Sequence, residues 1–399
     1  MISARNDDVP ALGADEWTML VREAVRHGVA PLVQARLERS HDLTPPDNVR
    51  RALKACHLRT GLDNLRLLTR LAEVLRQWQA HGIAVIVLKG AWLAQSVYAD
   101  PSLRSMGDAD LLVRRTDLER ARELLRASGW QEGPATEWTS PTGGGHQLPV
   151  FRLGSACLEL HWAIEDDESP FAIDGDGLWQ RAVPAQVGGA TALALAPEDL
   201  LLHLALHTAY GHGWLQFDNG LRGLVDIAAC LKYFEGRLNW DILVERARAW
   251  RMHACVWLTL MLVRELLRVC APQAMLDRLA PPHADHTPFD AATELVLGHH
   301  YQDLRTHLPV LASAWLTKRW HRLPRSAHWR AHALPCAEAL AKAYPALRSR
   351  LLRPLRHPAH WADLLNEVAH LSFDRQARSL AARERRRVRM LRWLEMGIN

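Results

Sequence analysis

Hydrophobic residues recur at helical spacing through the N-terminal part of the chain. The spacing predicts a helix over 15–39 that is interrupted at Gly28–Pro31, and a long helix over 49–81 that Gly82 ends. In the long helix we expect one apolar stripe, formed by Leu53, Leu58, Leu62, Leu65, Leu68, Leu71, Val74, Leu75 and Trp78. Because such a stripe is usually buried, we expect this segment to pack against the part of the chain that follows.

The pattern changes at Ile83–Leu88, a short run rich in β-branched residues that predicts a buried strand. Lys89-Gly90 is expected to end that strand, and a short helix over Ala91–Tyr98 follows until Asp100-Pro101 breaks it. A second strand is predicted over Asp108–Val113, and it begins with two carboxylates. This order of strand, turn, helix and strand is typical of a phosphate site.

Asp108 and Asp110 lie two positions apart on the predicted strand, so their side chains point to the same face. Like charges side by side repel each other, which a folded chain tolerates where water or a cation separates them. Mg²⁺ is the natural cation, because it takes hard oxygen ligands and leaves room for substrate phosphates. The alternative is a solvated strand end that carries two aspartates by chance.

Further elements follow along the chain. The residues 116–119 form a capping-box pattern that predicts a helix to Ser128, and 131–145 reads as a loop that could close over a substrate or form a hairpin tip. Two strands over 147–153 and 156–164 predict a β-hairpin, and alternation places Glu159 and His161 on one of its faces.

Several of these motifs occur together in a known family. They are Leu88-Lys89-Gly90, Tyr98, Arg104, Asp108-Ala109-Asp110-Leu111-Leu112-Val113, Leu158-Glu159-Leu160-His161-Trp162 and the helix that starts at Pro197-Glu198-Asp199-Leu200 with its histidines. The pattern resembles the DNA polymerase β-type nucleotidyltransferase superfamily, in particular its uncharacterised bacterial branch, over roughly residues 80 to 260. One departure is that the wider superfamily has Gly-Ser where this chain has Lys89-Gly90.

The resemblance implies a reaction and its residues. It implies Mg²⁺-dependent transfer of a nucleoside monophosphate from an NTP to a hydroxyl-bearing acceptor, with Mn²⁺ as a second candidate cation and pyrophosphate as the product. The metal ligands and catalytic residues would be Asp108, Asp110 and Glu159. The NTP would be bound by Lys89, Gly90 and Arg104. Lower-ranked candidates for acceptor contacts are His146, His161, His207 and Asp226.

Other interpretations remain open at this point. Glu159 could be a surface residue on an edge strand, and His203 with His207 could bind zinc with Asp226, although the metalloprotease pattern is absent. The chain could also be a catalytically silent nucleotidyltransferase-fold protein that binds and regulates. A third interpretation is a helical scaffold whose arginines bind an anionic partner such as nucleic acid.

Composition adds limits to these interpretations. The formal net charge is +5, and arginine carries nearly all of the positive charge. The one dense charge run is 383–389, which we interpret as a solvated helix while leaving a nucleic-acid contact open. The six cysteines form no CxxC pair and predict reduced core residues in a cytoplasmic protein. The longest apolar run, 254–263, is too short to cross a membrane, and no membrane partner is expected.

The predicted fold class is α+β. We expect an N-terminal helical segment over 1–81, a small mixed nucleotidyltransferase sheet with covering helices over 82–195, and a large all-helical acceptor-binding and C-terminal domain over 196–399.

Overall fold

The computed structural model describes residues 12–40, 43–134, 139, 145–167, 169–211, 217, 220–281, 287–298, 358, 386–387 and 389–395. The chain divides into two compact units, a larger one of residues 1–289 with 394–399 and a smaller one of residues 290–393. In the smaller unit, Arg386 donates through Nε and Nη2 to the two carboxylate oxygens of Glu294, at 2.9 and 3.0 Å. The larger unit mixes helices with one sheet, which confirms the predicted α+β class.

In the described part of the chain, a seven-stranded sheet forms the centre of the larger unit, with strand order β3-β4-β5-β2-β1-β7-β6. The strands are β1 (Val85–Val87), β2 (Ala109–Val113), β3 (Gln131–Glu132), β4 (Phe151–Leu153), β5 (Ala156–His161), β6 (Val183–Val187) and β7 (Ala190–Ala194). Strand β1 is antiparallel to β2 and parallel to β7, and β2 is parallel to β5. The predicted strands and the β4–β5 hairpin are therefore confirmed.

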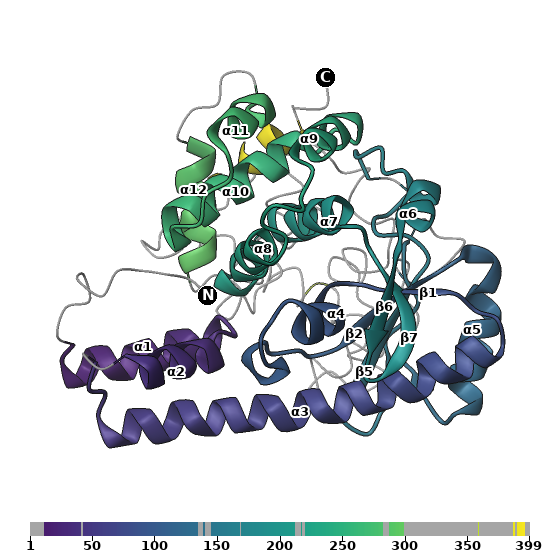
Figure 1. Cartoon of the computed structure of the whole chain (residues 1–399), viewed down its shortest axis with the longest axis horizontal. Helices are drawn as coiled ribbons and strands as arrows, with labels where there is room; N and C mark the ends of the chain where they lie inside the picture. The colour runs from purple at the N-terminus through teal and green to yellow at the C-terminus, as the bar shows by residue number, and fades with distance from the viewer. Residues whose placement is uncertain are drawn as a thin grey trace. The chain divides into compact units, whose positions relative to one another are not determined.

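Three helices precede the sheet, α1 (Ala14–Arg26), α2 (Ala30–Arg39) and α3 (Asp47–Ala80), as the hydrophobic spacing predicted. Figure 1 shows α3 running along the sheet, where it contacts β5, β6 and β7. The C-terminal half of α3 supplies much of the core, with Leu71 and Trp78 fully buried. The N-terminal half of α3 contacts α2 instead of the strands (Figure 1).

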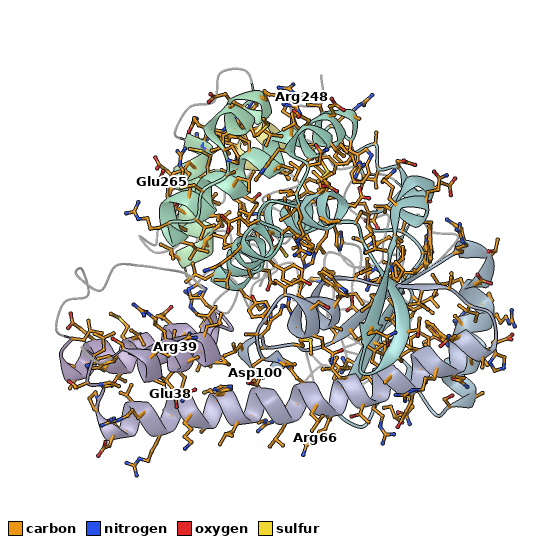
Figure 2. The ribbon with its side chains drawn as sticks, viewed as in Figure 1. Glu38, Arg39, Arg66, Asp100, Arg248 and Glu265 are labelled. Carbon is orange, nitrogen blue, oxygen red and sulfur yellow. The ribbon has the colours of Figure 1, made fainter. Side chains whose placement is uncertain are left out.

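The predicted apolar stripe of α3 is wrong at three positions, because Leu58, Leu62 and Leu65 are 61%, 54% and 63% exposed. At about 100° of rotation per residue these leucines lie roughly opposite the buried Leu71. Arg66 projects from the same outward side of the helix (Figure 2). The buried face of α3 therefore covers a smaller part of the helix circumference than the leucines of α3 do.

Two helices connect the first strands, α4 (Lys89–Ser96) and α5 (Leu118–Ala127). Lys89 and Gly90 are the first residues of α4, so they begin the helix instead of forming a separate turn. The predicted capping box before α5 is wrong, since the helix is preceded by the 3₁₀ turn η3 (Arg115–Asp117) and its N-cap makes no side-chain hydrogen bond.

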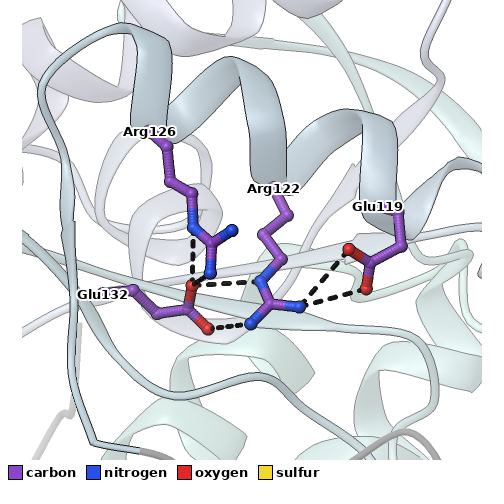
Figure 3. Close-up of polar contacts among 4 residues, drawn as sticks. All are labelled: Glu119, Arg122, Arg126 and Glu132. Carbon is purple, nitrogen blue, oxygen red and sulfur yellow. Dashed lines mark hydrogen bonds and ion pairs between the residues drawn. The ribbon is translucent and has the colours of Figure 1, made fainter.

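An ion-pair cluster ties α5 to the edge of the sheet (Figure 3). Glu132 of β3 accepts hydrogen bonds from Arg122 Nη2 at 2.9 Å and from Arg126 Nη2 at 2.6 Å. Arg122 also contacts Glu119, one turn earlier on the same helix. Glu132 therefore holds the short strand β3 against α5, which helps to cover an otherwise exposed sheet edge.

Six helices follow β5: α6 (Gly175–Arg181), α7 (Pro197–Ala209), α8 (Leu221–Tyr233), α9 (Trp240–Ala249), α10 (His253–Leu267) and α11 (Gln273–Leu279), counted up to residue 281 in the described chain. Asp199 of α7 is completely buried and accepts hydrogen bonds from Arg181 at 2.9 Å and Arg246 at 2.6 Å. The carboxylate thereby links α7 to α6 and α9, and the buried charge has the partners that burial requires.

The cysteine prediction holds in part. All five described cysteines are free, and Cys230 and Cys255 are buried, but Cys270 is exposed. None of the described helices is long and apolar enough to cross a membrane. Most of the predicted loop over 131–145, and most of the arginine-rich run over 383–389, lie outside the described residues.

Candidate active site

Strands β2 and β5 give one face of the sheet its polar character. In their parallel register Asp110 is the partner of Glu159, and Leu112 is the partner of His161. Alternate residues point to opposite faces, so Leu111 and Leu160 lie on the other face, where both are fully buried. The pairing therefore brings together two acidic residues that are far apart in sequence, as the family resemblance implied.

Asp110, Glu159 and His161 form a cluster whose ligand atoms all lie within 4.8 Å of one another. His161 Nε2 lies 3.2 Å from Asp110 Oδ1 and 3.6 Å from Glu159 Oε2. Two carboxylates and an imidazole are donors that divalent cations accept in proteins. The cluster contains two of the three predicted metal ligands, and His161, which we expected near the acceptor, lies between them.

Lys89 reaches the same carboxylate from α4. Its Nζ lies 3.0 Å from Asp110 Oδ1, and only 12% of the Lys89 side chain is exposed. Lys89 has a φ of +37°, a region that residues other than glycine rarely adopt. Such strain persists only where the surrounding structure imposes it, and it is common at functional sites. Lys89, which was predicted to bind NTP, thus has a strained backbone conformation and places its ammonium group in the acidic cluster.

The two clustered carboxyls are held in their charged form. Burial raises the pKa of Asp110, but the Lys89 ammonium and the hydrogen bond to His161 outweigh burial and hold that pKa well below its usual range. Burial likewise raises the pKa of Glu159, while its hydrogen bond to His161 brings the net pKa below the usual value. Both groups are therefore anionic at neutral pH, the form that a metal ligand needs.

Asp108 lies just before β2, is half-buried, and is not part of the three-residue cluster. Burial, together with the charges of Asp110 and Glu159, raises the pKa of the Asp108 carboxyl to about 6. The Asp108 carboxyl is thus close enough to interact electrostatically with both Asp110 and Glu159. A cation among the three carboxyls would relieve this repulsion and favour ionised Asp108.

Arg104 and Asp226 were both predicted to contact substrates, and here they bind each other. Arg104 donates through Nε to Asp226 Oδ1 at 2.9 Å and through Nη2 to Asp226 Oδ2 at 2.7 Å. Tyr98 donates to the same carboxylate at 2.7 Å, and Asn64 donates to the Arg104 carbonyl at 2.7 Å. Arg104 and Asp226 are only 8% and 3% exposed. The pair docks α8 onto the loop that leads to Asp108.

Gly90 makes room for the Arg104 guanidinium, because a Cβ atom at Gly90 would lie 2.7 Å from Arg104 Nη1. Asp226 fixes that guanidinium, so it cannot move aside freely. We expect Gly90→Ala to lower the free energy of unfolding by about 1–3 kcal/mol, the usual cost of overpacking. Chemical denaturation would measure the change. Gly175→Ala is a matched control, since no atom lies within 4 Å of a Cβ there, and equal stability of both variants would contradict the steric argument.

Two histidines that were predicted to contact the acceptor, His146 and His207, lie near the acidic cluster. His146 pairs through Nδ1 with Asp166, a partner that no local sequence pattern indicated, and its ring stacks on His161 with centroids 5.5 Å apart. His207 lies near enough to Asp110 for its charge to be one of those that lower the Asp110 pKa, although burial and Lys89 have larger effects. In the described chain His203 and His207 belong to no metal-ligand cluster, so the zinc interpretation gains no support.

Comparison with known proteins identifies the type of chain. A family model described as an uncharacterised nucleotidyltransferase matches residues 13–268, more than half of the sequence. No curated protein matches the chain. The match covers α1 to α10 and the whole of the described sheet, and it includes the acidic cluster, Lys89 and the Arg104–Asp226 pair.

Proposed function

We propose a specific reaction for this chain, which belongs to the uncharacterised nucleotidyltransferase family and is therefore a transferase. The reaction is transfer of a nucleoside monophosphate from an NTP to a hydroxyl group of an acceptor, with release of pyrophosphate. The observation that supports it best is the pairing of ionised Asp110 and Glu159 beside Lys89 and His161. Acidic and cationic groups at one place can hold both a metal and a polyphosphate.

The acidic cluster fits a divalent cation, because its ligand atoms lie within 4.8 Å of one another and its carboxyls are anionic. We expect Asp110 and Glu159 to hold Mg²⁺, with Asp108 as the third carboxylate and Mn²⁺ as a substitute ion. Bound metal supplies neutralising charge for the phosphates and lowers the pKa of a hydroxyl nucleophile. His161 would fix the orientation of both carboxylates through its ring nitrogen.

Lys89 is positioned to bind phosphate oxygens. Its ammonium already lies among the carboxyls, and a polyphosphate bound at the cluster would offer it a second anionic partner. A lysine ammonium binds phosphate as a compact point charge and needs no fixed bonding direction. Charge stabilisation and positioning are most of what phosphoryl transfer requires from a protein.

The acceptor is open to several chemical classes, namely sugars, small antibiotic-like molecules, peptides and protein side chains. A catalytically silent protein that binds nucleotide is the second candidate function. The ionised carboxyl pair supports the enzyme over the silent protein. Asp110 is only 5% exposed, and burying a charged carboxylate beside another one costs folding free energy, which a role in metal binding and catalysis would explain. Turnover of NTP that depends on Mg²⁺ would separate the two.

The test is incubation of the purified protein with each α-labelled NTP and Mg²⁺, following label transfer to cell extract or to the protein itself. We expect transfer from at least one NTP, and loss of transfer in Asp108→Asn with the fold retained. Full activity of Asp108→Asn would refute its assignment. Absence of transfer with all four NTPs, combined with nucleotide binding, would favour the silent protein.

A further inference from the structure

The imidazole of His161 faces two carboxylates with one nitrogen atom. Its Nε2 lies 3.2 Å from Asp110 Oδ1 and 3.6 Å from Glu159 Oε2, and the two carboxylates come from neighbouring strands. Both distances are longer than the roughly 2.9–3.0 Å that is most common for an N–H···O hydrogen bond, and a single ring N–H cannot be aligned well with both oxygens. A partner that lies between the three atoms would use all of them.

The spacing of these atoms fits a single bound cation. Neighbouring ligands of an octahedral ion with bonds of about 2.1 Å lie about 3 Å apart, and those of a tetrahedral ion lie about 3.4 Å apart. The separations of 3.2 and 3.6 Å at His161 are of this size. Asp110 Oδ1 also contacts Lys89, but a carboxylate oxygen has a second lone pair for an ion. His161 and Asp110 are buried while Glu159 is half-buried, so the cluster can be reached from solvent on the Glu159 side.

The His161 ring is held in this orientation by its neighbours. The ring of His146 stacks on it with centroids 5.5 Å apart, and His146 is itself tied through Nδ1 to Asp166. The backbone N–H of Trp162, the next residue, donates to the His146 carbonyl at 3.0 Å. Outer contacts of this kind orient the histidines that bind metals in proteins. The ring is therefore restrained with Nε2 directed into the cluster.

We infer that His161 Nε2 is a direct ligand of the cation, and that the cluster therefore binds a divalent transition-metal ion such as Mn²⁺ more tightly than Mg²⁺. The inference rests on the proposed function, which requires a cation at Asp110 and Glu159. Imidazole nitrogen suits transition-metal ions, whereas Mg²⁺ selects oxygen ligands and loses its bound water reluctantly. The nitrogen ligand adds affinity for Mn²⁺ and adds little for Mg²⁺, which the carboxylates alone would hold.

The experiment measures binding of the metal alone to the purified chain, with label transfer measured in parallel. Calorimetry with Mn²⁺ and with Mg²⁺ gives the two affinities, and pulsed electron paramagnetic resonance of bound Mn²⁺ shows whether a nitrogen atom is coordinated to it. We expect tighter binding of Mn²⁺ and a nitrogen signal in the unaltered protein. His161→Gln should remove the nitrogen signal and weaken Mn²⁺ binding roughly hundredfold, since the loss of an outer contact to a ligand alone costs about 10–100-fold. Binding of Mg²⁺ should fall much less.

Control variants assign the nitrogen signal to one residue. His81→Gln is the matched control, because it removes an imidazole from the exposed C-terminal end of α3, and it should change neither the affinities nor the signal. His146→Gln and His207→Gln remove the two other histidines that lie near the cluster, and both should retain the signal. Retention in these two variants supports His161 as the ligand even where His161→Gln does not fold, which circular dichroism would show.

Each result decides the inference. If bound Mn²⁺ has no nitrogen ligand, or if a folded His161→Gln protein keeps the nitrogen signal, His161 is not a ligand and the inference is wrong. Equal affinities for Mn²⁺ and Mg²⁺ would also contradict it. In these cases label transfer by the unaltered protein would mean that the proposed function stands. If neither ion binds and no label is transferred, the proposed function fails and the inference fails with it.

Discussion

Replacing Asp110 with asparagine is expected to reduce nucleotidyl transfer by roughly a hundred- to a thousandfold, the range seen when one preorganised electrostatic group is lost. Asp110 is the residue on which the site converges, because Lys89 and His161 both contact its Oδ1, at 3.0 and 3.2 Å. An asparagine side chain keeps the shape but carries no charge. The substitution would leave Glu159 as the one anionic member of the cluster and would lower the affinity of the cluster for a divalent cation. The initial rate of label transfer at saturating Mg²⁺ measures the effect.

Two controls make the Asp110 result interpretable. Asp63→Asn removes a carboxylate from the outer part of α3, where its side chain is 40% exposed, and should leave the rate unchanged. Circular dichroism of Asp110→Asn should show the same helical content as the unaltered protein, because an amide can still accept a hydrogen bond from Lys89. A folded Asp110→Asn protein with undiminished transfer would remove Asp110 from the mechanism.

The sequence was sufficient for the elements around this site. A short β-branched run predicted β1, and residue alternation placed Glu159 and His161 on one face of β5. Both inferences use local periodicity, which depends on neighbouring residues alone. That Asp110 and Glu159 are register partners is a tertiary fact, and the resemblance to a known family supplied the reason to expect them together.

Features that depend on distant partners could not be predicted in this way. The residues of the Arg104–Asp226 pair are 122 positions apart, and nothing near either residue signals the other. Leu58, Leu62 and Leu65 continue the apolar spacing of α3, yet they are exposed, because periodicity cannot tell which face of a helix a neighbour will cover. The parallel pairing of β7 with β1 likewise arises only when the sheet forms, and the local sequence of the β6–β7 hairpin does not indicate it.

Asp226→Ala is expected to have the largest effect on stability, a loss of about 3–5 kcal/mol in the free energy of unfolding, because breaking a buried ion pair leaves a charge without its partner. The Arg104 guanidinium would remain buried, and three hydrogen bonds to Asp226 would be lost, one from Tyr98 and two from Arg104. Urea denaturation followed by circular dichroism would measure the loss. Asp277→Ala offers a control on α11, where the exposed carboxylate accepts a hydrogen bond from Gln273 Nε2 at 2.7 Å.

A paired substitution tests whether charge or contact explains the Asp226 effect. If the loss comes from an unpaired buried cation, removing the cation as well, in Arg104→Met with Asp226→Leu, should restore most of the stability, since apolar replacement of a buried pair is often neutral. A double variant as unstable as the sum of the single ones would mean that the two residues act independently. Because the same pair holds α8 beside the loop that precedes Asp108, we expect the double variant to remain impaired in transfer even where its stability recovers, which would separate the structural role of the pair from its positioning of the site.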